Sequence, residues 1–286
     1  MQVTRDIAST RQAVAAARAA GRRIGFVPTM GALHAAHVSL MEAAGRAGDF
    51  VVVSIFVNPT QFGPGEDFEA YPRDEAGDLA ACTRAGVDLV FFPTVDVMYP
   101  ADAATTVHVA RLTDTLCGPH RPGHFDGVAT VVTKLFNIVQ PDAAYFGQKD
   151  AQQLAVIRRM TRDLDMPIEI VGCPTVREPD GLAMSSRNAY LDPAQRAQAT
   201  CLYRALEHAR ARIHAGQLSP ETITAEMRAI VCGAGPCQID YISIVDPDTM
   251  QPVPRIAGPV LVALAVRIGR TRLIDNLTVD PRQGTQ

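Results

Sequence analysis

The feature that most constrains the fold is a regular alternation of short apolar runs with helix-like segments through the first two-thirds of the chain. The run at residues 50–57, FVVVSIFV, is apolar almost throughout, which is typical of a parallel strand buried on both faces. Alternation of this kind predicts a doubly wound parallel sheet, an α/β fold of the Rossmann-like type. The expected strands lie at residues 24–28, 50–57, 88–93, 143–147 and 168–172.

The segments between these runs have helical periodicity. Between residues 126 and 140, apolar side chains recur at i, i+3 and i+4, which predicts an amphipathic helix packed on the sheet. Another helix is expected to begin at His34 or His37 and to end at Ala47. The remaining helices are expected at 11–23, with Ser9 or Thr10 as the cap, at 74–86, and at 150–164, with Leu154, Ile157 and Leu164 facing inward.

The pattern changes after about residue 176. Two helices are expected first, at 193–214 and 219–232, and Leu202, Leu206, Ala209 and Ile213 form the apolar stripe of the first. Three strands should follow, at 239–245, 259–267 and 272–279. We therefore predict two domains, a Rossmann-like domain over residues 1–175 and a smaller α+β C-terminal domain over residues 176–286.

Composition excludes several classes of partner. The net charge of −3 offers no basic surface for nucleic acid. No apolar run is long enough to span a bilayer, and the N-terminal stretch MQVTRDIAST lacks the apolar core of a signal peptide. The six cysteines show no CxxC spacing, so we expect reduced thiols that mostly fill the core, no zinc site and a cytoplasmic protein.

Lysine is rare in this chain. Of 27 lysine and arginine residues only two, Lys134 and Lys149, are lysines. A lysine retained in such an arginine-rich chain can be needed as a compact ammonium group, which a planar guanidinium does not replace. The residues around Lys149 favour this interpretation, whereas those around Lys134 do not decide between function and chance.

The stretch GALHAAH at residues 31–37 carries two histidines three positions apart. A metal pair, a structural role and a phosphate-binding role are all compatible with this spacing. The metal interpretation lacks the glutamate of HExxH and an obvious third ligand. The phosphate interpretation rests on position, because a strand followed by PTMG and a helix N-terminus is where an α/β sheet binds anions. Gly31 would let the backbone turn there.

Two further segments carry groups suited to phosphate. FGQKD at 146–150 ends a predicted strand, so Lys149 would lie at a helix N-terminus, where Asp150 could act as a helix cap. LAMSSRN at 182–188 offers two hydroxyls and a guanidinium that can donate to phosphate oxygens. A plain solvated turn, with serine as a cap, explains the second segment equally well from its residue types alone.

Uncharged amides follow the apolar run at 50–57. Asn58 and Gln61 stand in a loop rich in proline and glycine, where amides suit the hydroxyl and carboxylate groups of a small substrate. Ordinary turn chemistry is the alternative. No GxxxxGK[ST] phosphate loop occurs in the sequence.

Taken together and in order, these motifs resemble a known family. PTMGALHxxH, SIFVNPxQFGxxED, YPR, HFDGVATVV, FGQKD and TVREPDGLAMSSRN are similar to the motifs of the pantoate–β-alanine ligases, members of the nucleotidyltransferase superfamily with a HIGH-type histidine pair. The resemblance is closest over residues 24–192 and is looser toward the C-terminus.

The resemblance implies an activity. The family condenses pantoate with β-alanine in pantothenate biosynthesis, uses ATP and Mg²⁺, and releases AMP and pyrophosphate after forming a pantoyl-adenylate. Similar proteins are cytosolic homodimers. The first domain would bind nucleotide and pantoate, and the second would act as a lid that carries the MSSR loop. No nucleic-acid or membrane partner is implied.

The resemblance also implies roles for residues of this chain. His34, His37, Lys149, Ser185, Ser186 and Arg187 would be catalytic. Pantoate would be held by Met30, Asn58, Gln61 and Gln153. ATP would be bound by Met30, His37, Gly147, Lys149, Asp150, Met184, Ser185, Ser186 and Arg187. Tyr71 would lie in a flap over the site, and no protein metal ligand is assigned.

Two departures from the family pattern leave alternatives open. The histidine pair usually reads HxGH, but Ala36 replaces the glycine, and the acidic residues after YPR are thinned to DEAGD at 74–78. We expect Ala36 to affect ATP affinity modestly without abolishing activity. A nucleotide-binding regulatory protein without chemistry, and a nucleotidyltransferase for another acid, are the rival hypotheses.

Overall fold

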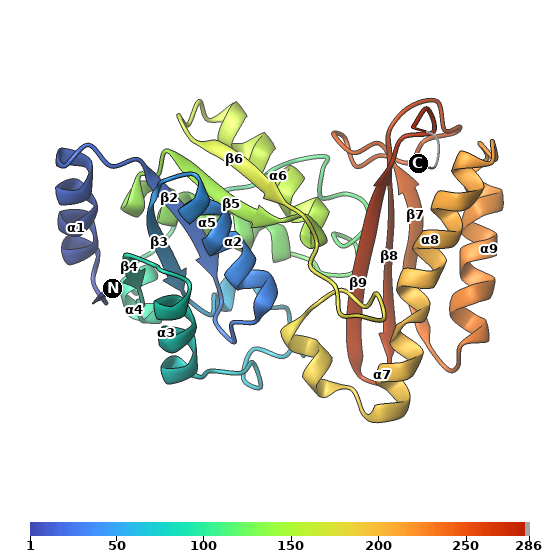
Figure 1. The fold of residues 1–286 in the computed structure, drawn as a ribbon, viewed down its shortest axis with the longest axis horizontal. Helices are drawn as coiled ribbons and strands as arrows, with labels where there is room; N and C mark the ends of the chain where they lie inside the picture. The colour runs from blue at the N-terminus through green and yellow to red at the C-terminus, as the bar shows by residue number, and fades with distance from the viewer. Residues whose placement is uncertain (284–286) are drawn as a thin grey trace. The chain divides into compact units, whose positions relative to one another are not determined.

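The computed structural model describes residues 1–283, which form two compact units. Unit 1 comprises residues 1–109, 121–148 and 156–174, and unit 2 comprises residues 110–120, 149–155 and the chain from Thr175 onward. The assignment of domains to residues 1–175 and 176–286 remains a prediction. Each unit has its own sheet, as Figure 1 shows.

Unit 1 is built on a six-stranded sheet in the order β1-β4-β3-β2-β5-β6, and every neighbouring pair is parallel. The predicted parallel α/β fold is therefore confirmed. The short strand β1 was not predicted, because three residues are too few to show a period. The strands are β1 Gln2–Thr4, β2 Ile24–Thr29, β3 Phe50–Ile55, β4 Leu89–Phe91, β5 Ala143–Gly147 and β6 Glu169–Cys173.

The strand order contains a switch point between β2 and β5. From β2 the chain moves outward through β3 to β4, and it then returns to place β5 on the other side of β2. Loops that leave the carboxyl ends of strands at such a point diverge and leave room for a ligand. Three neighbouring strands thus bring Met30, Asn58 and Gly147, at or just beyond their ends, to one edge of the sheet.

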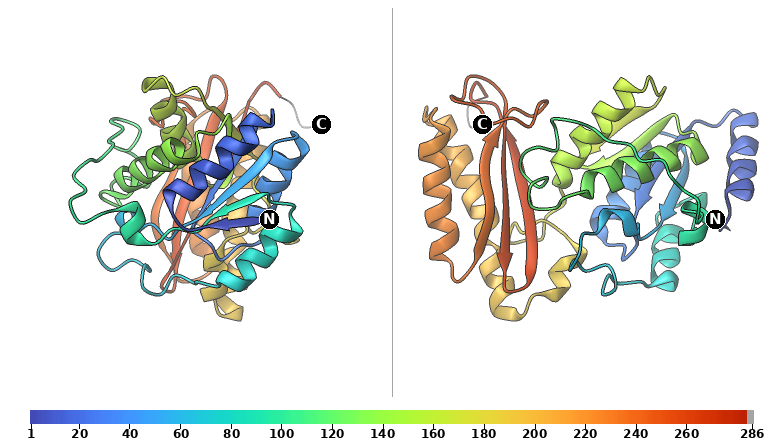
Figure 2. Two further views of the ribbon diagram at one scale, coloured as in Figure 1. Left: turned by 90° about the vertical axis from the view of Figure 1, so that its left-hand side faces the viewer. Right: turned by 180° about the vertical axis from the view of Figure 1, so that it is seen from behind.

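Helices cover both faces of this sheet. On one face, Phe26 of β2 makes an edge-to-face contact with Phe136 of α5 (His124–Val139) at 6.4 Å between ring centroids. On the other, Val27 joins a buried cluster with Met41 of α2 (Ala35–Arg46) and Cys82 of α3 (Glu75–Arg84). Figure 1 shows the α2 side, and the right-hand view of Figure 2 shows the α5 side.

The first helix begins earlier than we predicted. The helix α1 spans Ile7–Ala19, and Asp6, not Ser9 or Thr10, is its N-cap. The Asp6 carboxylate accepts from the Ser9 backbone N–H at 2.8 Å and also from the Ser9 hydroxyl. An aspartate three residues upstream therefore satisfies the free N–H, and Ser9 becomes a donor to the cap.

Two predictions about later helices were wrong. Leu164 does not face inward, because α6 (Ala151–Asp163) ends one residue before it and its side chain is 52% exposed. Leu154 and Ile157 are buried as expected. The helix predicted at 193–214 is divided into α7 (Pro193–Ala199) and α8 (Cys201–His214) at Thr200, whose hydroxyl donates to the Ala197 carbonyl at 2.8 Å.

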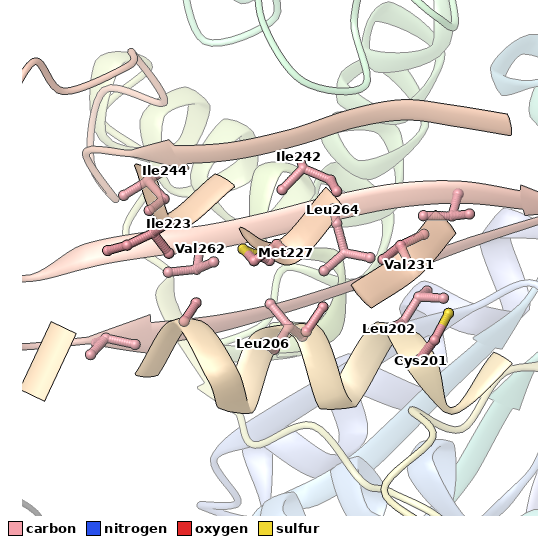
Figure 3. Close-up of a cluster of buried hydrophobic side chains, with 14 of the residues drawn as sticks. Cys201, Leu202, Leu206, Ile223, Met227, Val231, Ile242, Ile244, Val262 and Leu264 are labelled. Carbon is pink, nitrogen blue, oxygen red and sulfur yellow. The ribbon is translucent and has the colours of Figure 1, made fainter. Parts of the chain in front are cut away.

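Unit 2 combines helices with a three-stranded antiparallel sheet in the order β7-β8-β9. The strands are Gln238–Val245, Val260–Ile268 and Thr271–Val279, and α8 and α9 (Pro220–Gly233) pack on the sheet. The four predicted stripe residues of α8 are all buried. Figure 3 shows Leu206 of α8, Met227 of α9 and Leu264 of β8 converging in this core. The predicted α+β character is confirmed.

The cysteines of the described residues are all free thiols. Four are buried, Cys237 is half-buried and Cys232 is exposed. Burial raises the pKa of Cys82 and of Cys201 to about 11, so these two thiols are protonated at neutral pH and act as small apolar side chains.

We expect opposite effects from the same substitution at two glycines. A Cβ at Gly25 in β2 would lie 2.4 Å from Asp49 Oδ2, and Asp49 is held by Tyr145 Oη at 2.7 Å and Arg23 at 3.0 Å. Gly25→Ala should lower the free energy of unfolding by about 1–3 kcal/mol, measured by chemical denaturation.

The matched control is Gly45→Ala, because a Cβ at Gly45 on the exposed side of α2 meets no atom within 4 Å. This variant should raise the free energy of unfolding by up to about 0.5–1 kcal/mol, since alanine restricts the unfolded chain. Equal effects of the two substitutions would contradict the close approach of Gly25 to Asp49.

Candidate active site

The turn between β2 and α2 has a left-handed backbone held by a buried carboxylate. Gly31 has φ +83° and Ala32 has φ +50°. The Asp78 carboxylate accepts from the backbone N–H groups of Ala32 at 3.1 Å and Leu33 at 2.7 Å. A Cβ at Gly31 would lie 2.7 Å from Asp78 Oδ2, so glycine is required there by both conformation and space.

Asp78, which belongs to the acidic segment DEAGD at 74–78, has a structural role in holding this turn. It is 4% exposed and lies on the buried face of α3, with Ala81 and Cys82. Burial raises the pKa of Asp78, although the two backbone N–H groups act in the opposite sense. Sequence reasoning missed this role; the available signal was an acidic residue on the apolar stripe of a helix.

The histidine pair lies at the start of α2, as predicted. His34 is the N-cap, and the two rings are 4.1 Å apart between centroids. The His34 backbone N–H donates to His37 Nδ1 at 3.3 Å. Because Nδ1 accepts this bond, the neutral His37 ring carries its proton on Nε2. Ala36 is half-buried in the same turn.

Three of the predicted pantoate residues contact one another. Asn58 Nδ2 donates to Gln61 Oε1 at 3.1 Å, and Gln61 Nε2 lies 2.9 Å from Met30 Sδ. Asn58 and Gln61 are 1% and 8% exposed, so these amides are buried. The residues come from the ends of β2 and β3 and from η1 (Pro59–Gln61), a short 3-10 helix.

A charged pair holds the loop that follows Gln61. Glu66 accepts from Arg121 Nε at 2.7 Å and from Arg121 Nη2 at 2.6 Å. His124, at the first position of α5, lies 2.8 Å from the Gln61 carbonyl oxygen through Nδ1, and 2.9 Å from Arg121 through Nε2. Since carbonyl oxygen only accepts and guanidinium only donates, the neutral His124 ring carries its proton on Nδ1.

The predicted flap has its own aromatic cluster. The Phe62 ring lies 5.4 Å from that of Phe68 and 5.9 Å from that of Tyr71, and Arg73 stacks over Phe68 at 5.2 Å. Tyr71 is 5% exposed. The segment after Gln61 is therefore packed by its own side chains as well as by the Glu66–Arg121 pair.

Gly147 ends β5 in unit 1, and the other remaining predicted site residues belong to unit 2. Lys149 and Asp150 lie in η2 (Gln148–Asp150), which runs directly into α6, and Gln153 is half-buried on that helix. The Lys149 carbonyl accepts from Asn276 Nδ2 of β9 at 2.8 Å. Strand β9 thus holds the backbone of the turn that carries the lysine.

The segment that carries Met184, Ser185, Ser186 and Arg187 follows a tight hairpin. Arg177 and Ala183 form an antiparallel bridge, and Gly181 turns the chain with φ +91°. The Ser185 hydroxyl accepts from the Arg187 backbone N–H at 3.3 Å and caps η3 (Ser186–Tyr190). Ser185 therefore has the capping role that the sequence left open, without excluding a second role toward a ligand.

Strand β9 also anchors this hairpin. Arg177 makes two hydrogen bonds to Asp275, at 2.6 and 2.9 Å, and its guanidinium stacks on the Tyr203 ring at 4.4 Å. Asp275 is 2% exposed, and Asn276 is the next residue. Within unit 2, neighbouring β9 side chains thus hold the lysine turn and the serine-rich loop. Sequence reasoning missed this anchor, because strand periodicity does not reveal which polar residues pair.

Residues 1–283 contain no group of three or more histidine, cysteine, aspartate or glutamate side chains arranged to hold an ion. Over the same residues, no helix has both the length and the apolar character needed to cross a membrane.

The fold and these side chains define a class, namely α/β enzymes of the doubly wound type with polar side chains gathered at the carboxyl edge of the sheet. Within that class the chain belongs to the pantoate-beta-alanine ligase family, whose pattern it matches over residues 2–278. It is a ligase.

Relatives and solved structures agree with this assignment. The chain is 56% identical over 280 residues to the pantothenate synthetase of Moorella thermoacetica, covering 98% of this chain and 99% of the relative. It is similar in structure to the pantothenate synthetase of Thermus thermophilus, with a TM-score of 0.92, 48% identity, and coverage of 97% and 99%.

A second similar structure is the pantoate-beta-alanine ligase of Francisella tularensis, described as complexed with beta-gamma ATP and beta-alanine. Its TM-score is 0.81 at 33% identity, and the match covers 99% of each chain.

Acid should weaken the Glu66–Arg121 pair that holds the loop after Gln61. Burial raises the pKa of the Glu66 carboxyl, but hydrogen bonds from Arg121 outweigh this and hold the pKa below its ordinary value of 4.5. The stabilising effect is therefore complete above that pH and is lost as the pH falls through the lowered pKa. Glu66→Gln should reduce the free energy of unfolding by about 1–2 kcal/mol at neutral pH.

Chemical denaturation of both proteins across this pH range provides the test. The difference between wild type and Glu66→Gln should shrink as the pH falls below 4.5 through the lowered pKa, because the wild-type carboxyl then becomes protonated as well. A difference that stays constant with pH would show that the charge of Glu66 contributes nothing to holding the loop.

Proposed function

We propose that the chain joins pantoate to β-alanine through a pantoyl-adenylate intermediate. In the first half-reaction a pantoate carboxylate oxygen attacks the α-phosphorus of ATP, and pyrophosphate leaves. In the second, the amine of β-alanine attacks the acyl carbon of the mixed anhydride, loses a proton, and expels AMP. Membership of the pantoate-beta-alanine ligase family is the observation that carries this proposal.

The protein's contribution is positioning and neutralisation of charge, since no covalent enzyme intermediate is required. His34 and His37 are proposed to hold the ATP phosphates at the start of α2, where the helix N–H groups favour anions. Lys149, Ser185, Ser186 and Arg187 are proposed to grip the triphosphate. Gly147 and Asp150 would contact the ribose, and Met30 and Met184 would line the nucleotide site.

Pantoate is proposed to be held by Gln61 and Gln153, with Met30 and Asn58 around it. The buried amide pair of Asn58 and Gln61 supports this role, because its hydrogen bonds hold the amides in a defined orientation. The packed segment with Tyr71 is proposed to cover the site and to keep water from the anhydride.

Mg²⁺ is proposed to enter with ATP. Mg²⁺ commonly takes substrate phosphates and water with few protein ligands. When bound, the ion would neutralise phosphate charge as pyrophosphate leaves.

The remaining proposals concern assembly and location. We propose a cytoplasmic homodimer with no nucleic-acid or membrane partner, in which residues 176–286 act as a lid. Ala36 is proposed to alter ATP affinity modestly. The rival functions are nucleotide binding without chemistry and adenylation of a different acid.

Exchange of labelled pyrophosphate into ATP tests the first half-reaction directly. Purified protein with ATP and Mg²⁺ should exchange label only when pantoate is added, because pyrophosphate is released when the adenylate forms. Other carboxylic acids serve as controls. Exchange that does not depend on pantoate would refute the proposed substrate, and ATP binding without any exchange would favour the regulatory alternative.

The two lysines form a natural pair for a test of mechanism. Lys149→Ala should reduce turnover about 10²–10³-fold, the scale for losing a group that stabilises transition-state charge. Lys134, on α5, is the control, because its Nζ lies over the Tyr99 ring at 5.7 Å and has no proposed contact with substrate.

Steady-state assays with saturating pantoate and β-alanine provide the measurement. Lys134→Ala should keep turnover within about twofold of wild type, as expected for a partly exposed substitution. Near-normal turnover of Lys149→Ala would remove Lys149 from the mechanism.

A further inference from the structure

We infer that Tyr99 is a positioning residue: through Asn58, it orients the Gln61 side chain so that the amide NH₂, and not the amide oxygen, faces the pantoate oxygens. Tyr99 directly follows α4 (Val95–Met98) and lies outside every motif that marked the site. The inference rests on the proposed role of Gln61 in holding pantoate.

The first step concerns the orientation of the Asn58 amide. Asn58 Nδ2 lies 3.1 Å from the Gly127 carbonyl oxygen. A backbone carbonyl can only accept, so the NH₂ group of Asn58 must be on this side. A Cβ at Gly127 would lie 2.4 Å from the Thr60 carbonyl oxygen, so the glycine lets α5 come close enough for this contact.

The second step concerns the other end of the same amide. Asn58 Oδ1 accepts from Tyr99 Oη at 2.8 Å and from Thr60 Oγ1 at 3.0 Å. With Gly127 and Gln61 on Nδ2, all four hydrogen-bonding positions of the side chain are filled. Asn58 is 1% exposed, so removing a partner would leave a buried acceptor undersatisfied.

The third step concerns the Gln61 amide, whose orientation is set by its hydrogen bond from Asn58. Because Asn58 Nδ2 is a donor, the atom of Gln61 that faces it must be Oε1. The NH₂ group of Gln61 then points to Met30 Sδ at 2.9 Å. A thioether sulfur is a weak acceptor, so a hydroxyl or carboxylate oxygen of pantoate is a better partner for this NH₂ group.

The fourth step explains why Tyr99 can act as the first donor in this series of hydrogen bonds. Its ring lies 6.2 Å from the Phe56 ring and beneath the Lys134 ammonium. Burial raises the pKa of Tyr99 above its ordinary value of 10.0, so the hydroxyl keeps its proton at neutral pH. The order Tyr99, Asn58, Gln61 therefore ends in a group that donates toward the substrate.

The test is the substitution Tyr99→Phe, which removes only the hydroxyl. The KM for pantoate should rise about fivefold, the scale of one hydrogen bond. Turnover at saturating pantoate and the KM for ATP should each stay within about twofold, because the amide acts on binding and not on the chemical step. A general loss of structure would move all three quantities.

Tyr145→Phe is the matched control. Tyr145 is a second buried tyrosine, and its hydroxyl donates to Asp49, just before the amino end of β3. Removing it should lower stability without raising the KM for pantoate. If Tyr99→Phe leaves that constant unchanged, or if Tyr145→Phe raises it equally, the inference is wrong.

A double-mutant cycle with Gln61→Ala separates this inference from the proposed function. Gln61→Ala should raise the KM for pantoate, and adding Tyr99→Phe should raise it no further, because the group that Tyr99 orients is gone. Independent, multiplicative effects would overturn the positioning role alone. If Gln61→Ala leaves the KM unchanged, the proposed role of Gln61 fails, and the inference fails with it.

Discussion

The position of β2 between two parallel neighbours is the constraint on which the site in unit 1 depends. β2 pairs in parallel with β3 on one side and with β5 on the other. The chain that follows β2 leads to β3, whereas the chain that follows β5 leads to β6 on the opposite side. The carboxyl ends of all three strands therefore meet at one edge. The histidine pair, the buried amides and Gly147 lie at or beyond these ends because of strand order, although they are far apart in sequence.

Buried polar contacts then give this edge its shape. Asp78 binds the turn before His34, Asn58 satisfies its whole amide internally, and the Glu66–Arg121 pair holds the loop that follows Gln61. The N–H groups in these contacts can only donate and the backbone carbonyl oxygen of Gly127 can only accept, so the orientation of the Asn58 amide is unambiguous. In unit 2, Asp275 and Asn276 of β9 have the same function for the hairpin and for the turn of Lys149.

Particular elements show how far the sequence could predict the fold. The strand β5 lies where its apolar run predicted it, and the stripe on α5 is buried throughout, because burial of an apolar face dominates in both. The errors occurred where one polar contact decided the outcome: Asp6 took the cap expected from Ser9 or Thr10, and Thr200 divided a predicted helix. Leu164 lies beyond a helix end that periodicity alone did not define.

By itself, the sequence determined the parallel α/β class, the strands and helices of the core, and the family, because these depend on periodicity and on motifs that are local in the chain. Only the tertiary structure decided which buried polar groups pair. Arg121 with Glu66, Arg177 with Asp275 and Tyr99 with Asn58 join residues 41 to 98 positions apart. Contacts of that span depend on strand order and on the close approach of backbones, which no local pattern records.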